Sequence, residues 1–227
     1  MRDALLLNVA DVAECSLAMA PGAAPWAAVW LQGCRKRCRG CSAKPYRNVN
    51  RIMKLIPSRE LAWWALGIPG IAGVMISGGE PFLQAVALLQ FARTIGEKIL
   101  LGAYSGYTLA ELRENVVPAS AELLSRLDLL IDGPFKKDLA DPALAYRGSS
   151  NQEIHLLSRR SRVLTRDASP SVNCHVRVEE GRIVLTGSGA DAFSRILMVR
   201  GIDGHLCVHR SHRQAKPCAR QEAGHES

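Results

Sequence analysis

The chain has 227 residues, of which 48% are hydrophobic, so it can fill one globular domain and is not disordered throughout. Lys and Arg number 29 against 21 Asp and Glu, and the resulting charge of +8 fits an acidic partner or plain solubility. Nucleic acid is not expected as a partner, because no aromatic-rich basic strand accompanies the scattered charge. Seven cysteines, an odd number, argue against a secreted disulfide framework and favour a reducing cytoplasm.

No membrane segment is expected near the amino terminus. Residues 15–33 carry no charge, but Pro21 and Pro25 interrupt them, and Asp11 and Glu14 precede them. The stretch is therefore interpreted as part of a soluble protein.

The first third of the chain predicts two strands and one helix. A strand is expected over residues 5–10, then a loop over 18–25 and a short buried strand over 26–31. Residues 42–57 are polar and are interpreted as a loop. Ser58 is expected to cap a helix that runs to about Leu66.

Strands and helices alternate from residue 73 onward. The patterns predict strands over 73–77, 98–103 and 128–132, and helices from 82, over 108–114 and over 119–126. This alternation indicates an α/β protein with a parallel sheet and helical crossovers. Functional residues of such sheets gather at the carboxyl ends of the strands.

Three cysteines follow the predicted strand over residues 26–31. Cys34, Cys38 and Cys41 have the spacing C-x3-C-x2-C, and thiolates grouped in one loop are metal ligands first. Three ligands from one loop suit an iron–sulfur cluster with one iron left open. A zinc site completed by a distant Cys or His is the alternative.

A Gly-Gly-Glu sequence ends the next predicted strand. A side chain at Gly78 or Gly79 would block the approach of a ligand to the backbone there. The Glu80 carboxylate can anchor an ammonium group through a charge-assisted hydrogen bond. The alternative is an ordinary tight turn closed by Pro81.

The cysteine spacing together with Ser77-Gly78-Gly79-Glu80-Pro81 resembles the radical S-adenosylmethionine enzymes. Three further sequences narrow the resemblance to the activating proteins of anaerobic (class III) ribonucleotide reductase, which are glycyl-radical enzyme activases. They are Ser105-Gly106-Tyr107-Thr108, Asp132-Gly133-Pro134-Phe135 and Arg147-Gly148-Ser149-Ser150-Asn151-Gln152. The similarity runs from about residue 21 to 157, and more loosely to 187.

The resemblance implies a partial βα (TIM-like) barrel, and the residue pattern itself predicts a carboxyl-terminal β-hairpin that closes the domain. The hairpin is expected over residues 175–178 and 182–186. Residues 1–202 are expected to form the radical S-adenosylmethionine domain. Residues 203–227 are expected to be a polar, basic and poorly ordered tail, whose Cys and His residues leave metal binding open.

The resemblance also implies an activity, an oxidoreductase that cleaves S-adenosylmethionine reductively to a 5′-deoxyadenosyl radical and installs a glycyl radical on a partner. Side-chain acids and bases are not needed for this chemistry. Cys34, Cys38 and Cys41 would hold a [4Fe–4S] cluster. S-adenosylmethionine would contact Gly78, Gly79, Glu80, Ser105 and Asp132, and Arg147, Ser149 and Asn151 would form a partner or substrate loop. For Asp132 a cap or turn role, and for the loop residues a satisfied turn, stay open.

The implied partners are a large glycyl-radical enzyme of the ribonucleotide reductase type and a low-potential electron donor such as flavodoxin or ferredoxin. The basic residues between and around the cysteines would either tune the cluster or face that acidic donor. Two other functions stay open. The first is radical chemistry on another peptide or a small molecule, and the second is a non-catalytic metal-binding module.

Overall fold

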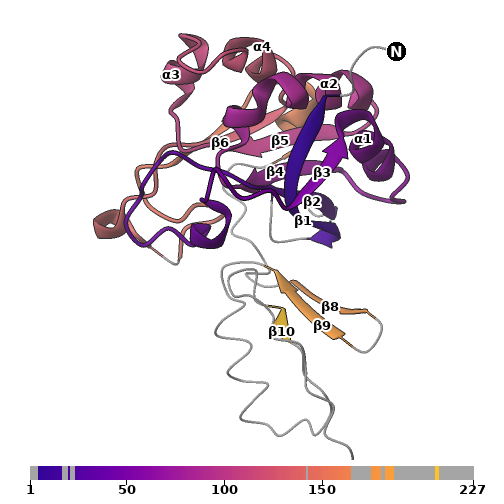
Figure 1. Cartoon of the computed structure of the whole chain (residues 1–227), viewed down its shortest axis with the longest axis horizontal. Coiled ribbons are helices and arrows are strands. Elements are labelled where there is room, and N and C mark those ends of the chain that lie inside the picture. The colour runs from indigo at the N-terminus through magenta and orange to yellow at the C-terminus, as the bar shows by residue number, and fades with distance from the viewer. Residues whose placement is uncertain are drawn as a thin grey trace, which may run out of the picture.

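The protein is described by a computed structural model over residues 5–16, 20, 24–141, 143–164, 175–179, 182–186 and 208–209. Its main body contains a seven-stranded sheet in the order β3-β1-β2-β4-β5-β6-β7 (Figure 1). The strands are β1 (Leu6–Ser16), β2 (Trp26–Leu31), β3 (Lys54–Pro57), β4 (Gly73–Gly78), β5 (Leu100–Tyr104), β6 (Leu129–Asp132) and β7 (Glu153–Leu156).

The sheet is mixed rather than wholly parallel. Strands β2, β4, β5 and β6 run parallel to one another, as the alternating pattern predicts. Strand β1 is antiparallel to both β2 and β3, and β7 is antiparallel to β6. The reason is the connections, because a parallel neighbour needs a long crossover, and neither the β1–β2 nor the β6–β7 segment contains an α-helix among its described residues.

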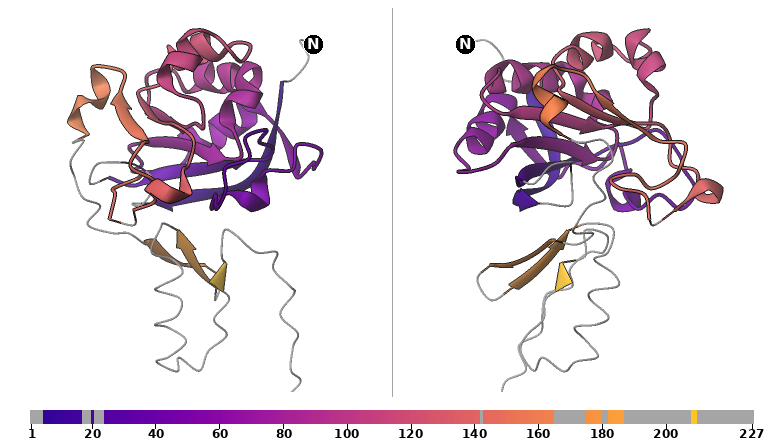
Figure 2. Two further views of the ribbon diagram at one scale, coloured as in Figure 1. Left: turned by 90° about the vertical axis from the view of Figure 1, so that its left-hand side faces the viewer. Right: turned by 180° about the vertical axis from the view of Figure 1, so that it is seen from behind.

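Four α-helices cover one face of this sheet (Figures 1 and 2). They contribute to one core with inward-facing strand residues such as Val29 and Ile76, which are at most 1% exposed. The helices are α1 (Ser58–Leu66), α2 (Ala85–Ile95), α3 (Leu109–Arg113) and α4 (Ser120–Leu124). Short 3-10 helices are η1 (Lys44–Tyr46), η2 (Pro81–Gln84), η3 (Lys137–Leu139) and η4 (Arg160–Val163).

The opposite face carries none of the α-helices of the described residues and has its own smaller core. Strand residues that alternate with the first set, such as Trp26, Met75 and Ile131, pack there against loop residues. Strand order ends at β3 and β7, so the described sheet has two edge strands. The barrel-like curvature implied by the family resemblance stays a prediction.

Two local predictions in the amino-terminal third are wrong. The segment 42–57, expected to be a loop, contains η1 and the edge strand β3. Strand β3 has only four residues, and Leu55 on it is 50% exposed, so it lacks the apolar run that marks a buried strand. Ser58 is the first residue of α1 rather than its cap, and its hydroxyl donates to the Leu5 carbonyl at 2.8 Å.

The carboxyl-terminal region forms a separate three-stranded sheet. Strands β8 (His175–Glu179) and β9 (Arg182–Thr186) pair antiparallel over the residues of the predicted hairpin, and β10 (Val208–His209) pairs with β9. The other residues of the predicted tail, and the expected boundary at residue 202, lie outside the described residues. Among the described helices, none combines the length and apolar character needed to cross a membrane.

Candidate metal and ligand site

The cysteine loop leaves the carboxyl end of β2 and is held by the segment around η1. The Gly33 amide donates to the Tyr46 carbonyl at 2.7 Å, and the Cys34 amide donates to the Arg47 carbonyl at 3.0 Å. Tyr46 is buried, at 8% exposed. The loop that carries the ligands is therefore stabilised by a helical turn that the sequence did not predict.

The three cysteines are free thiols of intermediate burial on this loop. Burial raises the pKa of the Cys34 thiol, and the neighbouring Glu80, Cys41 and Cys38 charges add to this rise in pKa. Burial likewise raises the pKa of Cys41, with a smaller contribution from Cys38. Charges that influence one another in this way lie close together. Metal coordination would relieve the cost of holding them as thiolates.

The three thiols do not converge on one point in the described structure. Over the part of the chain that the structure describes, no three His, Cys, Asp or Glu side chains converge closely enough to hold one metal ion. A cubane cluster bonds each thiolate to a different iron, so its ligands stand farther apart than the four around zinc. On this geometry alone the zinc alternative stays open.

The Gly-Gly sequence at the end of β4 packs backbone to backbone against the start of the cysteine loop. The Gly79 amide donates to the Leu31 carbonyl, and the Glu80 amide to the Gly33 carbonyl, both at 2.8 Å. A Cβ on Gly79 would lie 2.1 Å from the Gly33 carbonyl oxygen. A Cβ on Gly78, whose φ is +96°, would lie 2.4 Å from the Leu31 amide nitrogen. The space that sequence analysis assigned to a ligand is therefore occupied by the cysteine loop.

Glu80 is buried, at 1% exposed, where the loops after β4 and β5 meet. Its carboxylate accepts hydrogen bonds from the Phe82 amide at 3.1 Å, the Ser105 hydroxyl at 3.0 Å and the Gly106 amide at 2.7 Å. Burial raises the pKa of Glu80 to about 7, although these bonds and the Lys36 charge oppose the rise. The structure thus brings the predicted ligand residues Glu80 and Ser105 together.

Lys36 is a further member of the group of residues around Glu80. From the sequence it was considered only for its charge. Its ammonium lies 3.9 Å from the centroid of the Tyr107 ring, in the loop after β5. A residue between two of the cysteines therefore reaches the loop that binds Glu80. The site joins the carboxyl ends of β2, β4 and β5.

Asp132, at the end of β6, lies apart from this cluster in its contacts. Its carboxylate accepts a hydrogen bond from the Leu109 amide at the start of α3, and lies 3.1 Å from His155 Nε2. Leu130 packs in the core beneath the helices whereas Ile131 packs on the opposite face, so strand alternation directs Asp132 to the helix side. These contacts are those of a structural cap, and a cofactor role for Asp132 stays a prediction.

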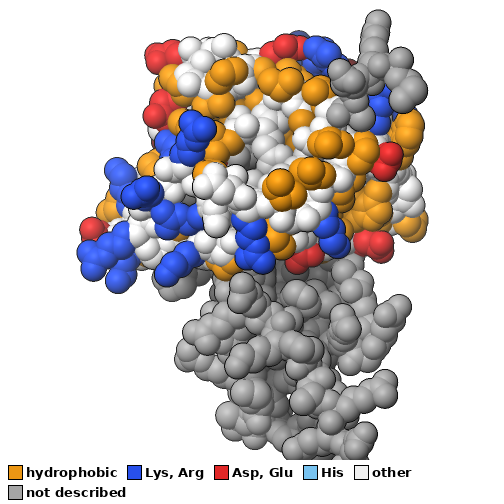
Figure 3. All heavy atoms as spheres, viewed as in Figure 1, with side chains coloured by type: hydrophobic (Ala, Val, Ile, Leu, Met, Phe, Trp, Pro, Cys, Tyr) orange, Lys and Arg blue, Asp and Glu red, His pale blue; other side chains and the backbone are white. Residues whose placement is uncertain are grey.

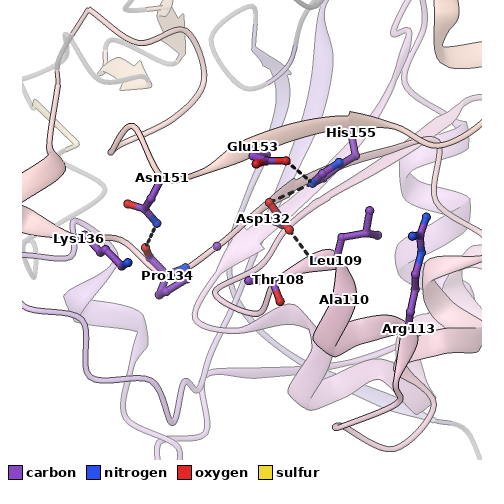
Figure 4. Close-up of a pocket in the computed structure, with 11 residues that line it drawn as sticks. Thr108, Leu109, Ala110, Arg113, Asp132, Pro134, Lys136, Asn151, Glu153 and His155 are labelled. Carbon is purple, nitrogen blue, oxygen red and sulfur yellow. Dashed lines mark hydrogen bonds and ion pairs between the residues drawn. The ribbon is translucent and has the colours of Figure 1, made fainter.

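A cleft of about 500 Å³ lies beside Asp132, between α3 and the loop that follows β6 (Figure 4). Asn151, Glu153 and His155 line one wall, and Thr108 and Arg113 lie on the α3 side. The cleft therefore unites one predicted cofactor residue, Asp132, with one residue of the predicted partner loop, Asn151.

The predicted partner loop braces the loop after β6. Asn151 donates to the Pro134 carbonyl at 2.9 Å, and the Ser149 hydroxyl accepts from the Lys136 amide at 3.2 Å. Arg147 donates to the Gln152 carbonyl at 3.3 Å. Ser149 is completely buried, so its side chain is a structural element of the loop rather than a surface for a partner. Partner contacts by Arg147 and Asn151 stay a prediction.

Aromatic residues also gather on the opposite face of the sheet, and of these only Tyr104 was expected, as part of the strand-end segment 104–107. Trp30, Tyr104 and Tyr146 pack against the smaller core there. The Tyr104 hydroxyl donates to the Tyr146 carbonyl at 3.0 Å. Trp30 stands next to the carboxyl end of β2, and this position is the signal that could have found it.

Comparison with known proteins assigns the class of the site. Residues 20–155 match the model of a family described as "4Fe-4S single cluster domain", which spans both the cysteine loop and the Gly-Gly-Glu sequence. The chain thus contains a single-cluster iron–sulfur domain.

Named relatives narrow the class. The anaerobic ribonucleoside-triphosphate reductase-activating protein of Pasteurella multocida is 30% identical over 138 residues, 56% of this chain and 84% of that protein. The protein of the same name from Vibrio cholerae is 33% identical over 135 residues, 56% and 84% of the two chains. That from Escherichia coli is 31% identical over 137 residues, 57% and 86%.

The chain belongs to the family of anaerobic ribonucleoside-triphosphate reductase-activating proteins. It is a radical S-adenosylmethionine enzyme, and its cofactors are a [4Fe–4S] cluster and S-adenosylmethionine.

Proposed function

We propose that this protein uses S-adenosylmethionine to install a glycyl radical on an anaerobic ribonucleoside-triphosphate reductase, in the cytoplasm. One observation carries the proposal. The Gly79 amide donates to the Leu31 carbonyl at the end of β2 and the Glu80 amide to the Gly33 carbonyl, both at 2.8 Å, so the Gly-Gly-Glu sequence is held against the start of the three-cysteine loop. The cytoplasm is supported by the free thiols, which stay reduced there.

In the proposed reaction, residues of this chain ligate the cluster, orient S-adenosylmethionine and exclude water. Cys34, Cys38 and Cys41 would hold the cluster through three irons and leave one iron open. The Glu80 carboxylate would accept the ammonium of the ligand's methionine half, held in place by Ser105. When bound, cluster and S-adenosylmethionine supply the one-electron chemistry that ends in hydrogen abstraction from a partner glycine. Proton transfer by a side chain is not required.

The test is anaerobic. The protein is reconstituted with iron and sulfide, reduced and given S-adenosylmethionine, and 5′-deoxyadenosine is quantified beside a Cys38→Ala variant. We expect product from the native protein and background from the variant. Addition of the reductase encoded in the same genome should then yield a glycyl radical, detected by electron paramagnetic resonance.

The outcomes separate the alternatives. Product without a radical on the reductase would indicate chemistry on another peptide or a small molecule. Iron uptake without any product, with or without the reductase, would contradict the proposal and leave a metal-binding module.

The electron donor is a second element of the proposal. Exposed basic residues surround the half-buried cysteines, and the Gly40 backbone lies against the Lys137 and Phe135 side chains of the loop after β6. Figure 3 shows Lys and Arg side chains gathered on this side of the molecule. We name this surface the basic rim; its exposed members are Arg35, Arg37, Arg39, Lys136 and Lys137. A positive surface around a redox centre favours an acidic carrier of the flavodoxin or ferredoxin kind.

Charge reversal tests the basic rim. Arg37→Glu combined with Lys137→Glu should slow cluster reduction by an acidic flavodoxin roughly tenfold at low salt, and the difference should shrink at high salt. Reduction by dithionite is the control, because a small reductant does not need the surface. An equal loss with both reductants would contradict the docking role.

A further inference from the structure

We propose that Lys36 is a ligand-binding residue that acts as a pair with Glu80, the two presenting opposite charges to the α-carboxylate and the α-ammonium of S-adenosylmethionine. This inference rests on the proposed function, because it names the groups of that ligand that the site recognises. It concerns a residue that lies between two cluster ligands and is not itself one.

Lys36 reaches from the cysteine loop to the side of Glu80. A Cβ built on Gly106 would lie 2.9 Å from Lys36 Cδ and 3.3 Å from Glu80 Oε2. The lysine stem and the carboxylate therefore flank the same glycine. The Lys36 ammonium lies beyond it, 3.9 Å from the Tyr107 ring centroid.

Glu80 has capacity for one more donor on Oε2, the oxygen that lies, like the Lys36 stem, near Gly106. Among the described residues, Oε1 accepts from both the Phe82 amide and the Ser105 hydroxyl, whereas Oε2 accepts from the Gly106 amide alone. A carboxylate offers about four acceptor positions in all. The open position on Oε2 matches an ammonium donor.

Lys36 does not use that position itself. The ion pairs found between the described residues do not include Lys36. The aromatic ring holds the cation through its π face and takes none of its N–H donors in conventional hydrogen bonds. The lysine therefore keeps donors for an anion.

Two opposite charges that lie near each other without pairing are complementary to an α-amino acid. Such a molecule carries ammonium and carboxylate on one carbon, so a ligand whose ammonium meets Glu80 brings its carboxylate close to Glu80 as well. Lys36, whose stem lies beside Glu80 at Gly106, is the cation that would meet the ligand's carboxylate. The pair would select the zwitterionic methionine end of the ligand.

The first test measures binding of S-adenosylmethionine to anaerobically reconstituted protein by calorimetry. Lys36→Met should weaken affinity about tenfold, the value of one charge-assisted hydrogen bond. Arg37→Met is the matched control, because it removes the same charge from the neighbouring, exposed position. It should change affinity less than twofold.

A second test asks which ligand group Lys36 meets. Decarboxylated S-adenosylmethionine keeps the ammonium and lacks the carboxylate. Native protein and Lys36→Met should bind this analogue equally. A tenfold difference that persists with the analogue would overturn the assignment to the carboxylate.

A third comparison does not alter the cysteine loop. Tyr107→Phe keeps the ring under the ammonium and should retain affinity, whereas Tyr107→Leu should weaken it about threefold. Should Lys36→Met fail to take up iron, equal affinities of the two Tyr107 variants would overturn the proposal. Equal effects of Lys36→Met and Arg37→Met would also overturn it. A native protein that binds ligand but forms no 5′-deoxyadenosine would instead contradict only the proposed function.

Discussion

Glu80 and Asp132 are both buried carboxylates at the carboxyl ends of parallel strands, yet their surroundings differ. Glu80 is held by the loop after β5 and lies near the Lys36 ammonium and the cysteines. Asp132 meets the first amide of α3 and the imidazole of His155. Glu80 therefore lies in the candidate metal and ligand site, whereas Asp132 lies at the N-terminus of α3.

The difference shows that a strand end does not by itself define a site. Side chains alternate between the two faces of a sheet, and Asp132 shares the helix-covered face with Leu130. Glu80 instead follows β4, and it accepts a hydrogen bond from the amide of Phe82 in η2. Four predictions test how far the two regions differ.

The largest effect is expected at Gly79, where the backbone after β4 packs against the start of the cysteine loop. Gly79→Ala should lower the free energy of unfolding by about 3 kcal/mol, because the new methyl would overlap the Gly33 carbonyl. Iron uptake should fall with it. Denaturant unfolding and iron content per chain are the measurements.

Gly67→Ala is the matched control for Gly79→Ala. Its added Cβ would meet the nearest atoms at 3.4 Å and 3.5 Å, ordinary contact distances. It should change the free energy of unfolding by less than about 1 kcal/mol. Similar losses in the two variants would contradict the close-approach explanation.

The next effect compares the two carboxylates directly. Glu80→Gln should weaken S-adenosylmethionine binding about tenfold to hundredfold, because a charge-assisted hydrogen bond is lost. Asp132→Asn should change the affinity less than about threefold. Calorimetry on reconstituted protein is the measurement. A large loss in Asp132→Asn would show that both carboxylates contact the ligand.

A pH dependence is expected from Glu80. Burial raises the pKa of Glu80 from 4.5 to about 7, and the ammonium binds the ionised form, so affinity should rise about tenfold from pH 6 to pH 8. The folded state holds a proton that the unfolded chain releases between these two pKa values, so stability from this group falls as pH rises through that window. Glu80→Gln should remove both trends, and a persistent trend would assign them to another group.

The smallest effect is expected at the start of α3. Thr108 caps this helix in a capping box with Glu111. Thr108→Ala should cost about 1 kcal/mol in the free energy of unfolding and leave ligand affinity unchanged. Weaker ligand binding by this variant would show that the cleft beside Asp132 takes part in the ligand site.

Local sequence patterns predicted the parts of the fold that depend on near neighbours. The helix expected from Ser58 to Leu66 is α1, and the strand expected after Gly73 is β4. The helix expected over residues 108–114 is α3, which begins one residue later because Thr108 is its cap, paired with Glu111 three positions on. Strand β3 was missed, since its pairing with β1 comes from residues some fifty positions away.

The sequence by itself determined the chemistry, because the cysteine spacing and the Gly-Gly-Glu sequence are short motifs that bring their ligands on single loops. Only the tertiary structure decided which predicted residues share a site. The backbones at the ends of β2 and β4 meet at Gly78 and Gly79. The loop after β5 brings Ser105 to Glu80, and its Tyr107 ring lies under the ammonium of Lys36, which comes from the cysteine loop. These contacts join residues that are distant in sequence, because strand register and the two faces of the sheet bring them together. No local sequence pattern therefore predicts them.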